Sequence, residues 1–265
     1  MKDRIKAYVL SIYKLRYFLK HLVALDLKNK FRRSKLGLLW TFISPLCITL
    51  IMSVIFSAVF KNDIVTYTPY ILSGTLFWDL FAGCFQGGSY AIVSNQFYLR
   101  QCNHPYSLYT LKTALGYVVT FLIAMISLLL WLAFINPMGI LIGIVHLPIT
   151  LLFYFAIAWS GTTIASYTYA KYRDYPMMAT LILQAMWYVS PVFLQESVFK
   201  GNDALFTWFS YNPITHLLNL IRMPFLNNRI PTGLDYLESL GFTLLLALLA
   251  YRISKKNGKE LIFYL

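Results

Sequence analysis

The stretch FRRSKLGLLW, residues 31–40, holds three cations in its first five positions and runs directly into an apolar segment. That segment, residues 38–60, is long enough to cross a bilayer as a helix, for which about 20 apolar residues suffice. Lys and Arg beside a hydrophobic segment keep that end of the span in the cytoplasm. The junction therefore predicts a membrane span that begins on the cytoplasmic side, and it leaves open whether its cations also bind a ligand.

The composition of the whole chain favours a membrane protein. Apolar residues make up 58% of the 265 positions and charged residues only 12%, whereas soluble domains carry about 25% charged residues. The formal net charge of +13 does not indicate nucleic-acid binding, because the cations lie between hydrophobic segments and not on one face of a soluble domain. We expect an integral membrane protein with no nucleic-acid partner.

The hydrophobic segments predict an all-α integral membrane protein with six transmembrane helices. The six segments are residues 38–60, 67–91, 111–135, 140–167, 177–195 and 237–254. They predict one transmembrane domain over residues 1–265. Its expected parts are a cytoplasmic interface segment (1–37), the spans (38–254) and a cytoplasmic tail (255–265).

The distribution of positive charge predicts the orientation of these spans. An even number of spans places both chain ends on one side, and nineteen Lys and Arg fall on that side. The other side holds four, namely Lys61, Lys200, Arg222 and Arg229. Because positive residues concentrate in cytoplasmic loops, both termini are predicted to be cytoplasmic.

Two segments outside the spans show helical patterns. In the N-terminal tail, apolar residues from Ile5 to Leu25 recur at three- and four-residue steps with lysines and arginines between them, which predicts an amphipathic helix. Because no soluble core is available to bury its apolar stripe, we expect this helix to lie in the membrane interface. The connection 196–236 contains two apolar runs, 205–211 and 214–226, that are too short to span. They predict two short re-entrant or interfacial helices between the last two spans.

The chain lacks the patterns of an enzyme, a nucleotide site or a metal site. No phosphate-binding loop, Ser/His/Asp arrangement or pair of carboxylates is evident. The three cysteines and four histidines are scattered and do not show metal-ligand spacing. We therefore expect no catalytic residue and no cofactor or metal in this chain, and any ATP must be bound by another chain.

Asp79 is the one carboxylate near the middle of a predicted span. A charge at the bilayer centre costs about 2.5–3.5 kcal/mol, so this side chain must face the protein interior or water. Two interpretations remain open, a residue of a transport pathway and a structural hydrogen bond to Thr75 or to an aromatic residue of a neighbouring helix. The structural interpretation is favoured, because a proton relay needs several such groups.

Two predicted spans contain a Ser-Pro pair, 44–45 in the first and 190–191 in the fifth. Proline removes a backbone hydrogen bond and bends a helix, so both spans are candidates for kinked pore or interface elements. Aromatic residues lie in the same two spans, although an aromatic belt facing lipid is the alternative interpretation. The candidate channel-lining residues are Trp40, Pro45, Trp187, Tyr188, Pro191 and Phe193.

Three stretches together resemble the membrane-spanning subunit of bacterial ABC exporters of polysaccharide. They are LVALDLKNKFRRSKLGLLWTFISPL (22–46), WYVSPVFLQESV (187–198) and YNPITHLLNLIR (211–222). The family exports O-antigen, capsular polysaccharide or teichoic acid, and the resemblance implies a multi-pass protein of the bacterial inner membrane. For this chain it implies a role in lipopolysaccharide biosynthesis, with O-antigen as the expected glycan.

The resemblance also implies the assembly and its moving parts. It implies a homodimer that encloses a channel, and a separate ATPase dimer that binds ATP and Mg²⁺ and docks from the cytoplasm. The interface helix would be about 4–30, the coupling helix would lie in 95–112, and the external gate helices in 203–226. The residues expected to contact the ATPase are Arg100, His104, Pro105 and Tyr106. The His104-Pro105 pair stands where the family usually has Phe-Pro.

The resemblance implies that the substrate is an undecaprenyl-linked glycan. Guanidinium and ammonium groups suit phosphate, so Arg32, Arg33 and Lys35 are candidates to bind the pyrophosphate of the carrier. A purely topological role for these cations is the alternative. Other functions that stay open are export of capsular polysaccharide, teichoic acid or a small drug, and a membrane enzyme that acts on lipid-linked glycans.

Overall fold

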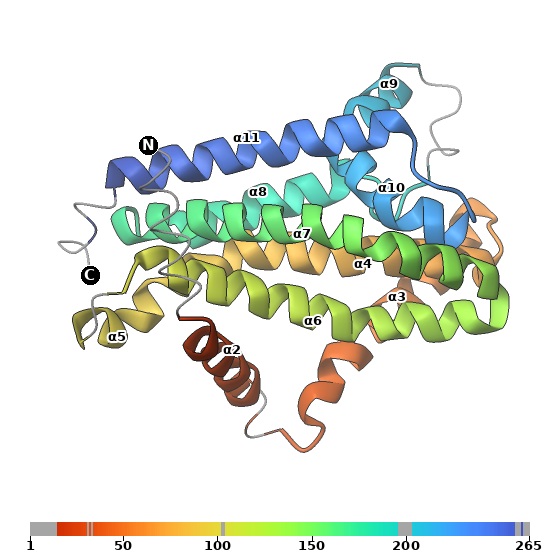
Figure 1. Cartoon of the computed structure of the whole chain (residues 1–265). Helices are drawn as coiled ribbons and strands as arrows, with labels where there is room; N and C mark the ends of the chain where they lie inside the picture. The colour runs from red at the N-terminus through yellow and green to blue at the C-terminus, as the bar shows by residue number, and fades with distance from the viewer. Residues whose placement is uncertain are drawn as a thin grey trace.

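The computed structural model describes residues 15–30, 32, 34–101, 104–195, 203–257 and 261. Within these residues the chain forms ten α-helices and three short 3-10 turns, with no β-strand (Figure 1). The helices are α2 (Arg16–Lys30), α3 (Trp40–Phe60), α4 (Ile64–Gln86), α5 (Gln96–Gln101), α6 (Tyr106–Ile135), α7 (Pro137–Lys171), α8 (Tyr175–Val189), α9 (Asp203–Tyr211), α10 (Pro213–Leu226) and α11 (Gly233–Asn257). The 3-10 turns are η1 (Gly37–Leu39), η2 (Gly87–Ala91) and η3 (Val93–Asn95).

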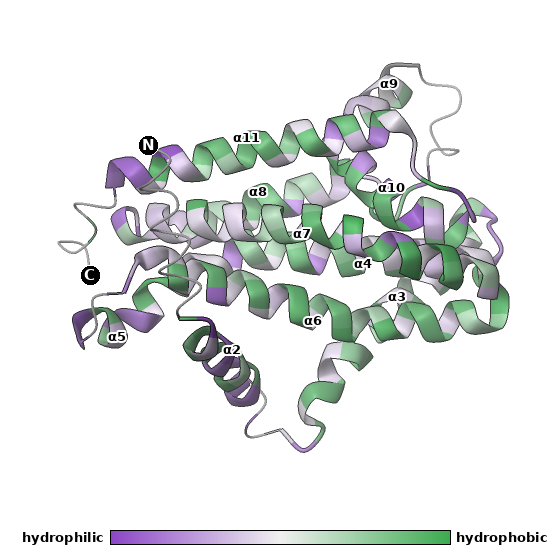
Figure 2. Ribbon diagram, in the orientation of Figure 1, coloured by the Kyte–Doolittle hydropathy of each residue, from purple (hydrophilic) through white to green (hydrophobic). Residues whose placement is uncertain are grey.

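The long helices form an elongated bundle with short helices at both ends. Figure 1 shows α4, α6, α7, α8 and α11 running lengthwise, with α9 and α10 at one end and α5 at the other. We call these the α10 end and the α5 end. In Figure 2 the lengths of α6, α7 and α11 are mostly hydrophobic, while hydrophilic residues gather on α2, α5 and the C-terminal part of α11. This distribution is the one expected of a bundle whose middle contacts lipid.

Four helices are long and apolar enough to cross a membrane. They are α3 with η1 (Gly37–Phe60), α6, α7 and α11. These four helices confirm the spans predicted at 38–60, 111–135, 140–167 and 237–254. The remaining two predicted spans, 67–91 and 177–195, correspond to α4 and α8, which do not stand out by length and hydropathy among the described residues.

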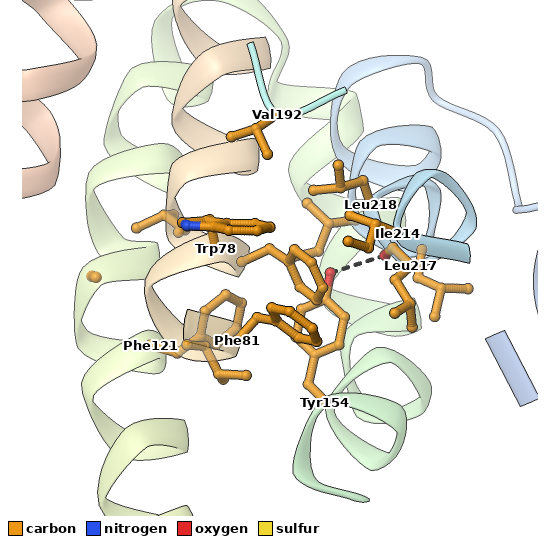
Figure 3. Close-up of a cluster of buried hydrophobic side chains, with 14 of the residues drawn as sticks. Trp78, Phe81, Phe121, Tyr154, Val192, Ile214, Leu217 and Leu218 are labelled. Carbon is orange, nitrogen blue, oxygen red and sulfur yellow. Dashed lines mark hydrogen bonds between the residues drawn. The ribbon is translucent and has the colours of Figure 1, made fainter. Parts of the chain in front are cut away.

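Helix α4 is the central helix of the bundle, which explains why its hydropathy is lower than that of the four long apolar helices. Fourteen of its 23 residues are buried, and it contacts α3, α6, α7, α8 and α10. Figure 3 shows the aromatic part of this core, where Trp78 and Phe81 of α4 lie with Phe121 and Tyr154. The Tyr154 hydroxyl donates a hydrogen bond to the Leu217 carbonyl oxygen at 3.0 Å (Figure 3). A helix enclosed by other helices does not have to be apolar on every face.

The prediction of a helix over 177–195 is wrong at its C-terminal end. Helix α8 ends at Val189, and Ser190 takes an extended conformation with φ −97° and ψ 152°. The backbone that follows, 191–195, is not helical. The cause is steric, because a proline disfavours the helical conformation of the residue before it. Pro191 therefore ends a helix instead of bending one, whereas Pro45 lies inside α3 as predicted.

The connection between the second and third predicted spans, residues 92–110, lies five residues earlier in the structure, between the end of α4 at Gln86 and the start of α6. Helix α6 begins at Tyr106, five residues before the predicted span, because Pro105 has the extended conformation (φ −66°, ψ 137°) of a residue that precedes a helix. The predicted coupling segment 95–112 is therefore divided between α5 and the first two turns of α6.

The N-terminal interface helix is confirmed as a helix over Arg16–Lys30, and the earlier part of the predicted range 4–30 lies outside the described residues. Its buried residues, Leu19 and Leu22, form a cluster with Leu108, Tyr109 and Leu111 of α6. The premise that the protein offers this helix no apolar surface is therefore wrong. Its position relative to a bilayer stays a prediction.

Candidate functional site

At the α5 end, a buried lysine joins three segments. Lys112 of α6 is 4% exposed, and its ammonium group donates to Asn95 Oδ1 of η3 at 2.9 Å. The same Nζ atom lies 2.7 Å from Asp26 Oδ2 of α2, whose side chain is 53% exposed. Asn95 in turn donates from Nδ2 to the carbonyl oxygen of Ala91 at 2.8 Å. A displacement of α2 is thus linked directly to α6 and to the loop that precedes α5.

The predicted ATPase-contacting residues lie around this junction. His104 lies 5.1 Å from the ring of Phe18 in α2, between ring centroids. Pro105 precedes α6 and Tyr106 is its first residue. Arg100 lies in the last turn of α5 and is exposed. The structure therefore brings three of the four residues to the start of α6, beside α2, with Arg100 on the adjoining short helix.

The cationic junction between α2 and α3 is only partly described. Arg32 and Lys35 are exposed, and Arg33 lies outside the described residues. Arg32 lines a shallow hollow of about 570 Å³ together with Asn29, Lys30 and Ser34. Such an exposed cluster of donors and positive charge is chemically able to bind phosphate oxygens.

A second cavity, of about 500 Å³, lies between α3, α4 and α6, and we call it the inner cavity. Asp79 lines it, together with Trp40 and Pro45, two of the predicted channel-lining residues. Thr75, the expected structural partner of Asp79, instead shares a 3.2 Å hydrogen bond with Thr49 Oγ1 of α3. The Asp79 carboxylate is exposed and has no hydrogen bond to another described residue.

At the α10 end, four consecutive backbone carbonyl groups after α8 are bound by side chains of α4 and α10. Arg222 donates from Nη1 to Pro191 O and from Nη2 to Val192 O, both at 2.7 Å. Tyr67 donates its hydroxyl to Phe193 O at 2.6 Å, and Tyr70 donates to Leu194 O at 2.9 Å. We call this arrangement the carbonyl clamp. It satisfies the carbonyl groups of buried backbone that no helix can satisfy.

Arg222 is the centre of the clamp. It is 5% exposed, and it also donates to Tyr70 O at 3.1 Å and to Ser73 Oγ at 3.3 Å. Its guanidinium carbon lies 3.6 Å from the centroid of the Tyr70 ring, a cation–π contact. Burial lowers the pKa of the guanidinium, because desolvation disfavours its charged form.

Gly74 allows the clamp to close. A β-carbon at this position of α4 would lie 2.2 Å from Val192 O and 2.7 Å from Arg222 Nη2. Neither atom can move away without losing the hydrogen bond between them. Gly74 is therefore required by the close approach of two backbones.

The predicted channel-lining residues form two separate groups. At the α10 end, Phe193 lies 5.0 Å from Phe56 of α3 and 4.8 Å from Trp187, and Trp187 lies 5.1 Å from Tyr188. Trp40 and Pro45 lie at the opposite end of α3, on the inner cavity. Within the protomer Phe193 is 6% exposed and Tyr188 is 57% exposed. Only the second of these two side chains is accessible in this conformation.

The predicted short helices are confirmed as α9 and α10, and a buried carboxylate links them to α11. Asp235 Oδ1 accepts a hydrogen bond from Asn219 Nδ2 at 2.9 Å and lies 2.9 Å from His216 Nδ1. The other ring nitrogen of His216 lies 2.9 Å from Ser210 O in α9. Asp235 Oδ2 accepts from the backbone and hydroxyl of Thr232. This network holds the two short helices against the start of α11.

In the sequence, Arg222 and Lys112 contribute only to the count of charges that predicts topology. A cation within an apolar segment is itself a signal, because a buried charge requires partners. The sequence does not identify those partners, since they lie 17 to 152 residues away along the chain.

Together these features define a multi-pass helical membrane protein with an amphipathic helix docked at one end and an unwound, clamped segment at the other. The chain belongs to the ABC-2 type transporter family, whose sequence model matches residues 17–226. The match covers α2 to α10 and leaves α11 outside.

Similar proteins cover most of the chain. It is 24% identical over 223 residues to the O-antigen export system permease protein RfbA of Myxococcus xanthus, across 84% of this chain and 85% of that protein. It is 23% identical over 235 residues to the protein of the same name from Klebsiella pneumoniae, across 87% and 89% of the two chains.

Family membership settles the class of activity. The chain is a transporter subunit and is not itself catalytic. In such transporters the permease pairs with a nucleotide-binding subunit, and that subunit binds the ATP.

Proposed function

We propose that this chain is the permease subunit of an ATP-driven exporter that carries a lipid-linked polysaccharide, O-antigen, from the cytoplasm across the bacterial inner membrane. The observation that carries the proposal is the similarity to O-antigen export permeases along more than four fifths of the chain. The family match over α2 to α10 supports the transport mechanism.

The proposed topology has six spans, with α4 and α8 added to the four long apolar helices. The 15 residues of α8 rise only about 22 Å, short of a hydrocarbon core of about 30 Å. The non-helical segment 190–195, which begins with a turn closed by a hydrogen bond from Val192 N to Ser190 O, continues from the end of α8, and we propose that it completes the crossing. Non-helical backbone at this depth is tolerated when it is buried in protein, and the carbonyl clamp supports this placement.

In this topology the α5 end and both termini are cytoplasmic. The excess of Lys and Arg at that end supports the assignment. Arg222 is buried in the clamp and so does not act as a free loop charge at the external end. With Arg222 and the equally buried Lys112 both set aside, eighteen Lys and Arg remain on the cytoplasmic side and three on the other, so the bias is kept.

We assign the channel to the interface of a homodimer. Helix α8 has only two buried residues, Ala179 and Leu183, and therefore offers most of its surface to a second protomer or to lipid. In the proposed dimer the channel-lining residues are Trp40, Pro45, Trp187, Tyr188, Pro191 and Phe193. Aromatic faces suit a passing glycan, because they pack against the apolar faces of sugars and carry no fixed charge.

The proposed coupling runs through the α5 end. The partner ATPase docks against Arg100, His104, Pro105 and Tyr106, and its movement shifts α2 through the bond between Lys112 and Asp26. Arg32, Arg33 and Lys35 then meet the pyrophosphate of the undecaprenyl carrier at the cytoplasmic leaflet. The exposure of Arg32 and Lys35 supports this role.

Deletion of the chain tests the proposal. Cells without it are expected to lose surface O-antigen and to accumulate the undecaprenyl-linked glycan in the inner membrane, measured by lipid extraction and glycan analysis. A plasmid copy restores export, and a plasmid copy beside an ATPase subunit that lacks its phosphate-loop lysine does not. Surface O-antigen at the normal level in the deleted cells contradicts the proposed function.

A further inference from the structure

The inner cavity is enclosed by elements that meet at the α5 half of the bundle. Trp40, Thr41 and Ser44 contribute from the first turns of α3, Asp79 from α4, and Tyr117 from α6. Lys30, at the end of α2, also lines the cavity. Its volume of about 500 Å³ falls within the range of small-molecule sites, about 300–1,000 Å³.

Two polar groups of this cavity, the Asp79 carboxylate and the Thr41 hydroxyl, make no hydrogen bond to another described residue. The Asp79 carboxylate is exposed, and the Thr41 hydroxyl oxygen is buried. Buried polar groups in folded proteins are nearly always hydrogen-bonded, so the buried Thr41 hydroxyl, beside the exposed Asp79 carboxylate in the lining of the same cavity, indicates a polar occupant.

The chemistry of the lining limits what that occupant is. An ionised aspartate only accepts hydrogen bonds, so the occupant must donate them. The Asp79 charge disfavours an anion, and the Lys30 charge disfavours a cation. A lipid acyl chain would leave both Asp79 and Thr41 without partners. A neutral polyhydroxyl compound fits all of these conditions.

The aromatic residues of the lining further limit the chemical class of the occupant. Trp40 is about half exposed and lines the cavity together with Tyr117, so two aromatic rings, each with flat faces, form part of its wall. Such faces pack against the apolar face of a sugar ring, while the ring's hydroxyl groups remain available for hydrogen bonds. Carboxylate, hydroxyl and aromatic faces together are therefore matched to a saccharide.

We propose that the inner cavity binds a sugar residue of the exported glycan within each protomer, with Asp79 accepting hydrogen bonds from its hydroxyl groups. The inference rests on the proposed function, and it assigns Asp79 to substrate binding instead of to a structural hydrogen bond. Because Lys30 belongs to α2, sugar in the cavity contacts the helix that the ATPase is proposed to move.

The test is saccharide binding by the purified complex of permease and ATPase in lipid nanodiscs. The probe is the oligosaccharide released by mild acid from the lipid-linked glycan of the deleted cells, which carries neither lipid nor pyrophosphate. The variants are Asp79→Leu, Asp79→Asn and Thr41→Val, and Asp174→Asn is the matched control. Asp174 is an exposed carboxylate in the turn before α8 and does not line the cavity.

The expected result is binding that is weaker by about tenfold or more for Asp79→Leu and by about threefold for Thr41→Val, with Asp174→Asn unchanged. Asp79→Asn keeps the shape and is expected to fall between Asp79→Leu and the wild type. If Asp79→Leu does not fold, Thr41→Val decides the question alone.

Wild-type affinity in both Asp79→Leu and Thr41→Val overturns the inference, as does a wild-type complex that does not bind the oligosaccharide. The proposed function fails differently, because deleted cells then keep their surface O-antigen and accumulate no lipid-linked glycan. The two failures are therefore recognised in separate experiments.

Discussion

Lys112 and Arg222 are the two buried cations of the described chain, at opposite ends of the bundle, and their surroundings differ. Arg222 is bound by four oxygen atoms and an aromatic ring, all from neighbouring helices and buried backbone. Lys112 is bound by one amide oxygen and by Asp26, a carboxylate that is half in solvent. Removing Arg222 leaves buried carbonyl groups without donors, whereas the bond to Asp26 can break and be replaced by water. The buried cation at the α10 end is thus held by more contacts than the one at the α5 end, and none of its partners is as exposed as Asp26.

The largest effect is expected from Arg222→Met. The substitution leaves the carbonyl groups of Pro191 and Val192 buried and unbound, at a cost of about 3 kcal/mol or more in unfolding free energy. Thermal unfolding of the complex in nanodiscs measures it, and export is expected to be lost.

Arg222→Lys is the matched control for that variant, because it keeps the positive charge and loses the bidentate hydrogen-bonding geometry of the guanidinium. It is expected to recover only part of the stability. If Arg222→Met unfolds at the same temperature as the wild type, Arg222 does not stabilise the carbonyl clamp as proposed.

The second-largest loss of stability is expected from Gly74→Ala. The added methyl group overlaps Val192 O and forces the clamp apart, at a cost of about 1–3 kcal/mol in unfolding free energy. Gly241→Ala in α11 is the control, since nothing lies within 4 Å of its β-carbon position. If the two variants unfold at the same temperature, the close approach of α4 to the 190–195 segment is not tight in the native protein.

A smaller effect on stability, and a larger one on transport, is expected from Asp26→Asn. The carboxylate is half exposed, so its loss should cost about 1 kcal/mol or less. The α2 helix is nevertheless less firmly tied to α6. Export per ATP hydrolysed is expected to fall while the ATPase activity of the complex is kept.

The control for Asp26→Asn is Asp174→Asn, which removes an exposed carboxylate far along the chain. Transport per ATP that is normal in Asp26→Asn would show that α2 does not carry the coupling. A large loss of stability would instead show that the α5 end is as rigid as the α10 end.

The smallest effect on stability is expected from Arg32→Gln with Arg33→Gln. Of the eleven Lys and Arg before residue 38, nine remain, so the orientation should be kept and the unfolding temperature unchanged. Export is expected to fall severalfold, because phosphate contacts at the α2–α3 junction are lost. Lys2→Gln with Lys6→Gln removes the same charge from the tail. Equal export by these two double variants means that the cations act only in orientation.

Much of the fold was predictable from short stretches of sequence. Residues 38–60 and 237–254 are spans because of their own hydropathy, and the spacing of Leu19 and Leu22 marks the apolar face of α2. Ser190-Pro191 illustrates the limit of such reasoning. Local sterics predict a break there, but whether the chain bends or unwinds depends on donors that satisfy the freed backbone, and Arg222 lies more than 30 residues away.

The candidate site was less predictable. The sequence predicts that Asp79 faces the protein interior or water. In the structure Asp79 lines the inner cavity, and the expected partner Thr75 bonds Thr49 instead. When other helices cover several faces of a helix, as they do for α4, the sequence does not show toward which neighbour a given side chain points. Trp40 begins α3 and Phe193 lies in the non-helical segment after α8. Only their packing shows that they lie near opposite ends of α3.

The sequence by itself determined that this protein lies in a membrane and which family it resembles, and it predicts how the chain ends are oriented, because hydropathy and charge bias act segment by segment against the bilayer. Only the tertiary structure decided that Arg222 binds buried backbone, that Lys112 ties α2 to α6, and that Asp79 lines a cavity with Trp40 and Thr41. Hydrogen bonds act over about 3 Å, so their pairing depends on how helices distant in the chain come together.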